Sequence, residues 1–194
     1  ITYDYPDENG TVLYQKVRAF PKKFWQQTPD GNKKLNGVRR VLYRLPELIK
    51  STGQVFIVGG EKDVESLREH DLTATTNDNG EGNWRSEFNQ FLKDRDVVIL
   101  EDNDEKGRKH GKVVSEGLHG VAERIKIIRF KELPQGGDVS DYLATHTKGD
   151  LIARQNNTPL FTGSYSEYFN ESKESCPETD WEDPIQFDLL KTPK

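Results

Sequence analysis

Two aspartates, two residues apart, give the clearest chemical signal in the sequence. Asp102 and Asp104 come directly after the apolar run 97–100. At the end of a strand, carboxylates at this spacing can turn toward one point, and they suit a hard divalent cation such as Mg²⁺ or Mn²⁺. An acidic turn that only caps the next helix would use the same residues. The metal interpretation gains weight because Asp138 and Asp141 follow the apolar run 125–129.

The elements that must position these carboxylates alternate between strands and helices. Apolar runs at 55–58, 72–75, 97–100 and 125–129 are separated by helical patterns at 63–70, 86–93 and 105–118. This alternation predicts a parallel sheet covered by helices, with ligands at the carboxyl ends of the strands. Gly59 and Gly60 end the first run, where glycine allows a tight turn and close approach of the backbone to a ligand.

Residues 1–50 are expected to form a small, basic, β-rich subdomain. The β-rich segments 1–5 and 11–18 flank a turn signal at 7–10 and predict a hairpin, and 46–50 suits a short helix with proline in its first turn. This region has ten basic residues against five acidic ones. That balance suits a nucleic-acid track, although a solvated surface has the same composition.

Three aromatic residues lie in a basic part of this subdomain. Phe20, Phe24 and Trp25 are interleaved with Lys22 and Lys23. Such a mixture suits stacking on bases beside phosphate contacts. The same aromatic side chains could instead pin the hairpin onto the sheet, and the sequence leaves both interpretations open.

The remaining composition narrows the class of protein. No run reaches the roughly 18 apolar residues that a membrane span needs, and no signal peptide opens the chain, so we expect a soluble cytoplasmic protein. Cys176 is the only cysteine, which excludes an intrachain disulfide. Because the chain has no methionine and begins with Ile1 in an expected strand, we interpret it as a fragment of a longer polypeptide.

The order of the motifs resembles a TOPRIM domain, and more narrowly the TOPRIM region of primase-like, primase-helicase type proteins of phages, plasmids and mobile elements. The similarity rests on residues 55–63, 74–77, 97–108 and 137–143 and covers roughly residues 1–150. It implies an α/β fold with a Rossmann-like parallel sheet and helices on both faces at 51–150, preceded by the β-rich subdomain at 1–50. Residues 151–194 would be a mostly irregular acidic linker toward a missing ATPase- or helicase-like region, with 181–185 as its approach.

The resemblance also implies a reaction and its participants. Asp102, Asp104 and Asp138 would hold Mg²⁺ or Mn²⁺, and nucleoside triphosphates would be joined into RNA primers on single-stranded DNA. The basic residues expected to hold template or phosphates are Lys22, Lys23, Arg39, Arg40, Arg44, Lys62, Lys106 and Arg108.

One position departs from the family pattern. The first strand of the family ends in Glu-Gly, whereas this sequence has Gly59-Gly60, and glycine cannot replace a carboxylate. Glu61, two residues on, is the candidate substitute; otherwise the change is a natural loss or a deliberate knockout. Two further functions therefore stand beside the primase: a degenerate TOPRIM module that binds metal, nucleotide or nucleic acid without polymerising, and a TOPRIM nuclease.

Overall fold

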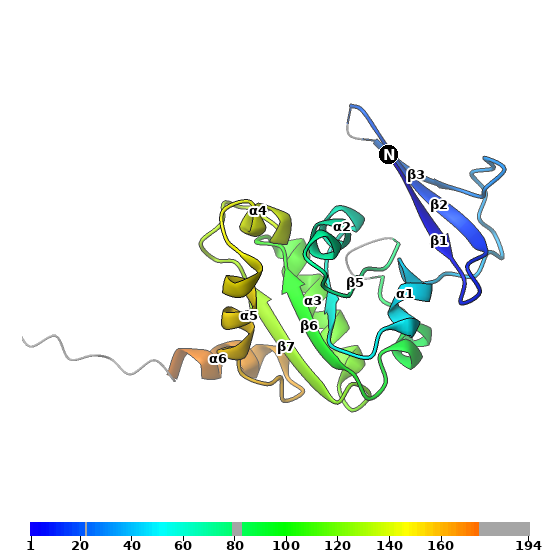
Figure 1. Cartoon of the computed structure of the whole chain (residues 1–194). Coiled ribbons are helices and arrows are strands. Elements are labelled where there is room, and N and C mark those ends of the chain that lie inside the picture. Colours follow the sequence, from blue (N-terminus) through cyan, green and yellow to red (C-terminus); the bar gives the residue numbers. More distant parts are fainter. Residues whose placement is uncertain (22, 79–82, 175–194) are drawn as a thin grey trace, which may run out of the picture.

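The computed structural model describes residues 1–21, 23–78 and 83–174 (Figure 1). Lys22 and residues 181–185, which the sequence singled out, lie outside these ranges. The first sheet is antiparallel, in the order β1-β2-β3, with β1 at Thr2–Pro6, β2 at Val12–Ala19 and β3 at Lys23–Gln27. The predicted hairpin is therefore confirmed, and β3 adds a strand that the sequence analysis did not identify.

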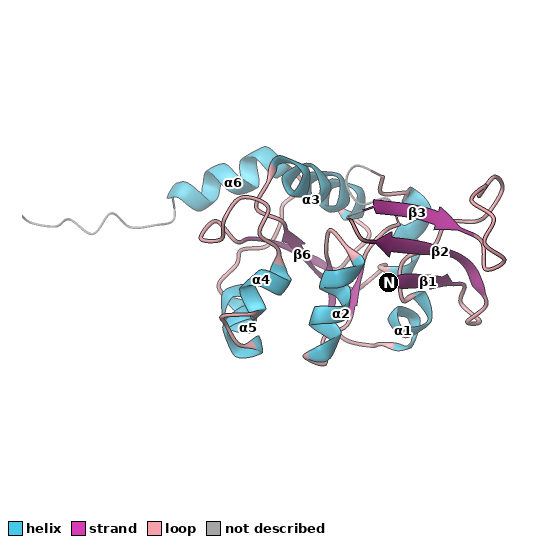
Figure 2. Cartoon of the chain, turned by 90° about the horizontal axis from the view of Figure 1, so that it is seen from above, coloured by secondary structure: helices cyan, strands magenta, loops and turns pink. Residues whose placement is uncertain are grey.

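The second sheet is parallel, in the order β5-β4-β6-β7. Its strands are β4 (Val55–Ile57), β5 (Ala74–Thr75), β6 (Asp96–Glu101) and β7 (Arg124–Arg129). The helices are α1 (Leu45–Lys50), α2 (Glu61–Glu69), the 3-10 helix η1 (Ser86–Phe91), α3 (Glu105–Leu118), α4 (Val139–Leu143), α5 (Lys148–Asn156) and α6 (Tyr165–Glu174). Figure 2 shows α3 and α6 on one face of the sheet and α2, α4 and α5 on the other, which confirms the predicted α/β architecture.

The expectation of mostly irregular structure beyond residue 150 is wrong for residues 151–174, most of which lie in α5 and α6. Thr147 starts α5 with a capping box that it forms with Asp150. The Tyr168 hydroxyl of α6 accepts a hydrogen bond of 3.2 Å from the Ile127 backbone N–H in β7. The polar composition hid these helices because few apolar residues are needed to anchor them. Among the described helices, none is both long and apolar enough to cross a lipid bilayer.

The two sheets share one hydrophobic core. Tyr5 and Tyr14 are fully buried, with their rings stacked at a centroid distance of 4.6 Å. The Tyr5 hydroxyl donates a hydrogen bond of 2.5 Å to Glu61, the first residue of α2. Lys16 of β2 lies 2.8 Å from the same carboxylate. Because Glu61 follows β4, this contact places the antiparallel sheet beside the carboxyl end of that strand.

His110 is a polar side chain inside the core. It lies on α3 with 2% of its surface exposed, and neither ring nitrogen has a well-formed hydrogen bond within the described part of the chain. Burial lowers the pKa of His110 from its ordinary value of 6.5 to about 4, and an interaction with the Val58 backbone opposes this only weakly. The imidazole is therefore neutral at physiological pH.

We expect His110 to make folding stability depend on pH. Between pH 6.5 and 4 the unfolded chain binds a proton at His110 that the folded chain does not, so acid favours unfolding. Across this window the free energy of unfolding should fall by up to about 3 kcal/mol from this residue alone. Urea unfolding of the wild type and His110→Phe at several pH values measures it. A stability difference between the two proteins that does not change with pH would contradict the assignment.

Candidate functional site

The turn after β6 carries the two aspartates at the predicted edge of the sheet. Asp104 caps α3, and its Oδ1 accepts a hydrogen bond of 2.7 Å from the Gly107 backbone N–H. Gly107 is pressed against the Asp102 backbone, because a Cβ at this position would lie 2.4 Å from the Asp102 carbonyl oxygen. The helix-capping interpretation is thus correct for Asp104. It occupies one carboxylate oxygen and leaves Oδ2 for another partner.

Asn103 ties this turn to the loop that leads to Asp138. Its backbone N–H donates to the Gly137 carbonyl at 2.8 Å, and its carbonyl accepts from the Gly136 N–H at 3.0 Å. Its side-chain Nδ2 donates to the Leu133 carbonyl at 2.7 Å. The sequence analysis missed this role, for which the only signal is an amide residue between two aspartates.

Asp138 starts α4 at the same edge of the sheet. Its Oδ1 accepts a hydrogen bond of 2.9 Å from the Asp141 backbone N–H, and the Asp141 carboxylate completes a capping box. Its Oδ2 lies 2.9 Å from the Lys62 Nζ. We call the end of the parallel sheet that carries Asp102, Asp104 and Asp138 the acidic edge. Lys62, predicted to hold phosphate, therefore lies at this edge and is paired there with a carboxylate.

Asp63 is a further acidic residue at this edge that the sequence analysis did not select. It is 5% exposed, and its Oδ1 accepts a hydrogen bond of 2.5 Å from the Ser140 hydroxyl. Burial, followed by the negative charge of Asp138, raises the pKa of Asp63 to about 7. The Asp63 carboxyl is therefore partly protonated at neutral pH.

Gly59 lies directly against Asp102. The strands β4 and β6 are paired neighbours, with Ile57 opposite Ile99, so the residues that follow them meet. A Cβ on residue 59 would lie 2.8 Å from the Asp102 Oδ2. The Asp102 carboxylate thus rests on the glycine backbone, where the side chain of a larger residue would begin.

Glu61, the candidate substitute for the missing family glutamate, is committed to other partners. Its side chain is 4% exposed and is bound by both Lys16 and the Tyr5 hydroxyl. A catalytic or metal-binding role would require these contacts to break, since they hold the carboxylate toward the antiparallel sheet.

Glu101, immediately before Asp102, is a buried charge that the sequence analysis also missed. Its carboxylate accepts hydrogen bonds of 2.6 Å from Arg129 and 2.5 Å from the Tyr165 hydroxyl of α6. Burial raises the pKa of Glu101, and Tyr165 and Arg129 oppose that shift. The strand end that carries Asp102 is therefore anchored both to β7 and to α6.

The donor set at the acidic edge suits a hard cation. Within the described residues no three acidic, histidine or cysteine side chains are placed to hold a metal ion together. Mg²⁺ is usually held by only one or two carboxylates, together with waters and substrate phosphates. Asp102 and Asp104 supply two oxygen-bearing side chains, and this chemistry fits Mg²⁺ or Mn²⁺ better than metals that prefer nitrogen or sulfur ligands.

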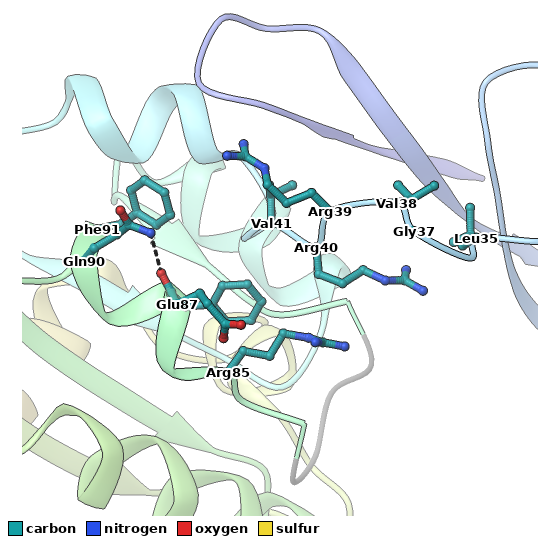
Figure 3. A pocket seen from close by; sticks show the side chains of 11 residues that line it. Leu35, Gly37, Val38, Arg39, Arg40, Val41, Arg85, Glu87, Gln90 and Phe91 are labelled. Carbon is teal, nitrogen blue, oxygen red and sulfur yellow. Dashed lines mark hydrogen bonds between the residues drawn. The ribbon is translucent and has the colours of Figure 1, made fainter.

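Two of the predicted basic residues line a hollow of about 560 Å³ between residues 35–41 and η1 (Figure 3). Arg40 pairs with the buried Asp78 at 2.9 Å, and Arg39 pairs with Glu8 at the surface. Arg85, also at the hollow and missed by the sequence analysis, has no ion pair among the residues that the structure describes. Of these three arginines, only Arg85 has a charge that no described acidic residue offsets.

The other predicted basic residues are distributed over several elements. Arg44 binds Glu47 at 3.0 Å and Glu65 at 2.9 Å, so it joins α1 to α2. Lys23 is exposed on β3, and Lys106 and Arg108 are exposed on the first turns of α3. Lys106 and Arg108 are thus the predicted cations that follow the aspartate pair directly in the chain.

The parallel sheet with the antiparallel sheet beside it is a fold that this chain shares with solved primase catalytic cores. The Escherichia coli primase catalytic core superposes with a TM-score of 0.65 at 20% identity, over 88% of this chain and 55% of that chain. A DnaG primase catalytic domain bound to single-stranded DNA gives the same values. The primase fragment of the bacteriophage T7 primase-helicase protein gives a TM-score of 0.53 at 20% identity, over 79% and 61% of the two chains.

This chain therefore spans only 55% to 61% of the length of these three structures. No protein-family model matches the chain, and no curated protein matches it. At 20% sequence identity, the structural similarity to these proteins establishes the fold of this chain alone.

The packing at the aspartate turn predicts opposite effects for two glycines of the same helix. Gly107→Ala should destabilise the protein by roughly 1–3 kcal/mol, because its Cβ would meet the Asp102 backbone. Gly117→Ala is the matched control: its Cβ would find only ordinary contact with Trp84 at 3.5 Å, and alanine should stabilise α3 by about 0.5–1 kcal/mol. Urea unfolding measures both. Equal effects of the two substitutions would show that the turn is not tightly packed.

Proposed function

We propose that this chain is the TOPRIM catalytic core of a DNA primase-like protein of the phage, plasmid or mobile-element type, which makes RNA primers on single-stranded DNA. The observation that supports this most is the position of Asp102 and Asp104 directly after β6, in a fold shared with primase catalytic cores. The proposal includes an ATPase or helicase region elsewhere in the same full-length protein.

The chain's own residues would share the work of nucleotidyl transfer. Asp102 and Asp104, which follow β6, would hold Mg²⁺ or Mn²⁺ together with Asp138, which begins α4. When bound, such an ion neutralises triphosphate charge and eases attack by a 3′-hydroxyl. Lys62, which pairs with Asp138, would exchange that partner for a phosphate oxygen.

Metal binding can be tested without any assumption about catalysis. We expect saturable Mn²⁺ binding by the wild type, followed by paramagnetic line broadening, and its loss in the double variant Asp102→Asn/Asp104→Asn. Asp30→Asn, in an exposed turn of the N-terminal subdomain, is the control and should bind as the wild type does. Equal, weak binding by all three proteins would remove the metal site from the proposal.

A second candidate function is a degenerate TOPRIM module that binds metal, nucleotide or nucleic acid without polymerising. The specific observation in its favour is the contact between Gly59 and Asp102. No carboxylate extends from residue 59, and Glu61 is held by Lys16 and Tyr5. A nuclease is a third function that the same aspartates could serve. The resemblance to primase-like proteins of the Arg/Lys-rich region before β4 favours primer synthesis over it.

Restoring a carboxylate at residue 59 separates these functions. We expect Gly59→Glu to raise metal-dependent primer synthesis by about 10²-fold, the scale of a positioned acid-base group, once Asp102 rotates away from the new Cβ. Gly59→Ala is the matched control, because it introduces the same Cβ without a carboxylate and should not raise the rate. Radiolabelled primer synthesis on single-stranded DNA measures both. No gain from Gly59→Glu, with Mn²⁺ still bound, would favour the non-catalytic module.

A further inference from the structure

The strand register sorts the aromatic side chains of the N-terminal subdomain onto different faces. Arg18 lies opposite Phe24, and Lys16 lies opposite Gln26, so these four side chains share one face of the antiparallel sheet. Trp25 lies on the other face, where the Lys33 Nζ is 4.9 Å from its ring centroid. Phe20 lies outside both strands, in the turn between β2 and β3.

The face that carries Phe24 is the one that meets the parallel sheet. Lys16 binds Glu61 at the start of α2, and Gln26 donates a hydrogen bond of 3.1 Å to Asp78, three residues beyond β5. Both contacts are made just beyond the carboxyl ends of strands, β4 and β5 respectively. Phe24 therefore stands on the side of the subdomain that turns toward the edge where Gly59 contacts Asp102.

Phe24 has the surroundings of a stacking residue. It is 47% exposed, although the sheet face that bears it also bears the buried Tyr5 and Tyr14. The Lys16 Nζ and the Arg18 Cζ lie 5.8 and 5.7 Å from its ring centroid. Lys16 is engaged with Glu61, whereas Arg18 makes no ion pair among the described residues.

We propose that Phe24 stacks on a nucleobase of the single-stranded template, while Arg18 neutralises an adjoining phosphate. An exposed aromatic ring flanked by cations is the arrangement by which proteins hold single strands without reading their sequence. The inference rests on the proposed function, which it deepens by naming the residue that positions the strand. We call Phe24 and Arg18 the stacking platform. Lys16 connects this platform to the start of α2, because it lies near the Phe24 ring and also binds Glu61.

Binding to a single-stranded oligodeoxynucleotide that carries 2-aminopurine tests the platform, with EDTA present so that catalysis is excluded. Phe24→Ala should lower the affinity about tenfold and reduce the change in 2-aminopurine fluorescence on binding. Phe24→Tyr should retain both, because it keeps an aromatic ring. Phe20→Ala is the matched control: it removes a ring that is 98% exposed in the turn, and it should change neither.

Salt dependence separates the stacking from the ionic contribution. Phe24→Ala should leave the slope of log affinity against log salt unchanged, since no charge is removed. Arg18→Gln should reduce that slope by about 0.7, the value for one phosphate of a single strand. An unchanged affinity in Phe24→Ala, or an equal loss in Phe20→Ala, would overturn the proposal.

A parallel measurement with a free nucleotide shows whether the base that stacks on Phe24 belongs to the template strand or to a nucleoside triphosphate. If 2-aminopurine ribonucleoside triphosphate alone gives the Phe24-dependent signal and the oligonucleotide does not, the assignment to the template strand is wrong. Failure of the proposed function is distinguishable, because a protein that makes no primer would still show Phe24-dependent binding of the strand. If primer synthesis occurs, Phe24→Ala should raise the KM for template more than it lowers kcat.

Discussion

One buried carboxylate, that of Glu61, fixes the antiparallel sheet against the parallel one. This carboxylate is bound by Lys16 and by the Tyr5 hydroxyl. Glu61 is also the first residue of α2, which follows the Gly59-Gly60 turn. Removing one partner of such a buried pair leaves a charge without compensation, which typically costs about 3–5 kcal/mol. The direction in which Phe24 faces and the path of the turn beside Asp102 both depend on this contact.

The acidic edge exists because glycines leave room for it. A Cβ at residue 111 would lie 2.0 Å from the Glu101 Oε1, and a Cβ at residue 107 would meet the Asp102 backbone. α3 can therefore lie close against the end of β6, while Arg129 and Tyr165 bind Glu101 from β7 and α6. A displacement of α6 would disturb the residue directly before Asp102.

The sequence predicted those parts of the fold in which burial imposes a simple pattern. The strands β4 and β6 are almost completely buried and appear as apolar runs, and α3 occupies the predicted span 105–118. β3 was missed because its five residues, Lys23–Gln27, are polar at three positions and none is fully buried. The position of Asp102 and Asp104 followed from the strand end, but the pairing of Glu61 with Lys16, 45 residues away, depends on how the two sheets pack.

Metal binding and nucleotidyl transfer are separable demands on this site. The first requires oxygen atoms at the end of β6, which Asp102 and Asp104 would supply. The second requires a group that acts on the reacting atoms, and Gly59 has no side chain to offer. The Asp102 carboxylate lies where a side chain at residue 59 would begin, so the two positions compete for one volume. A change at residue 59 would therefore alter the position of the candidate ligand Asp102 together with the chemistry, and only a comparison of glutamate with alanine at that position can separate the two effects.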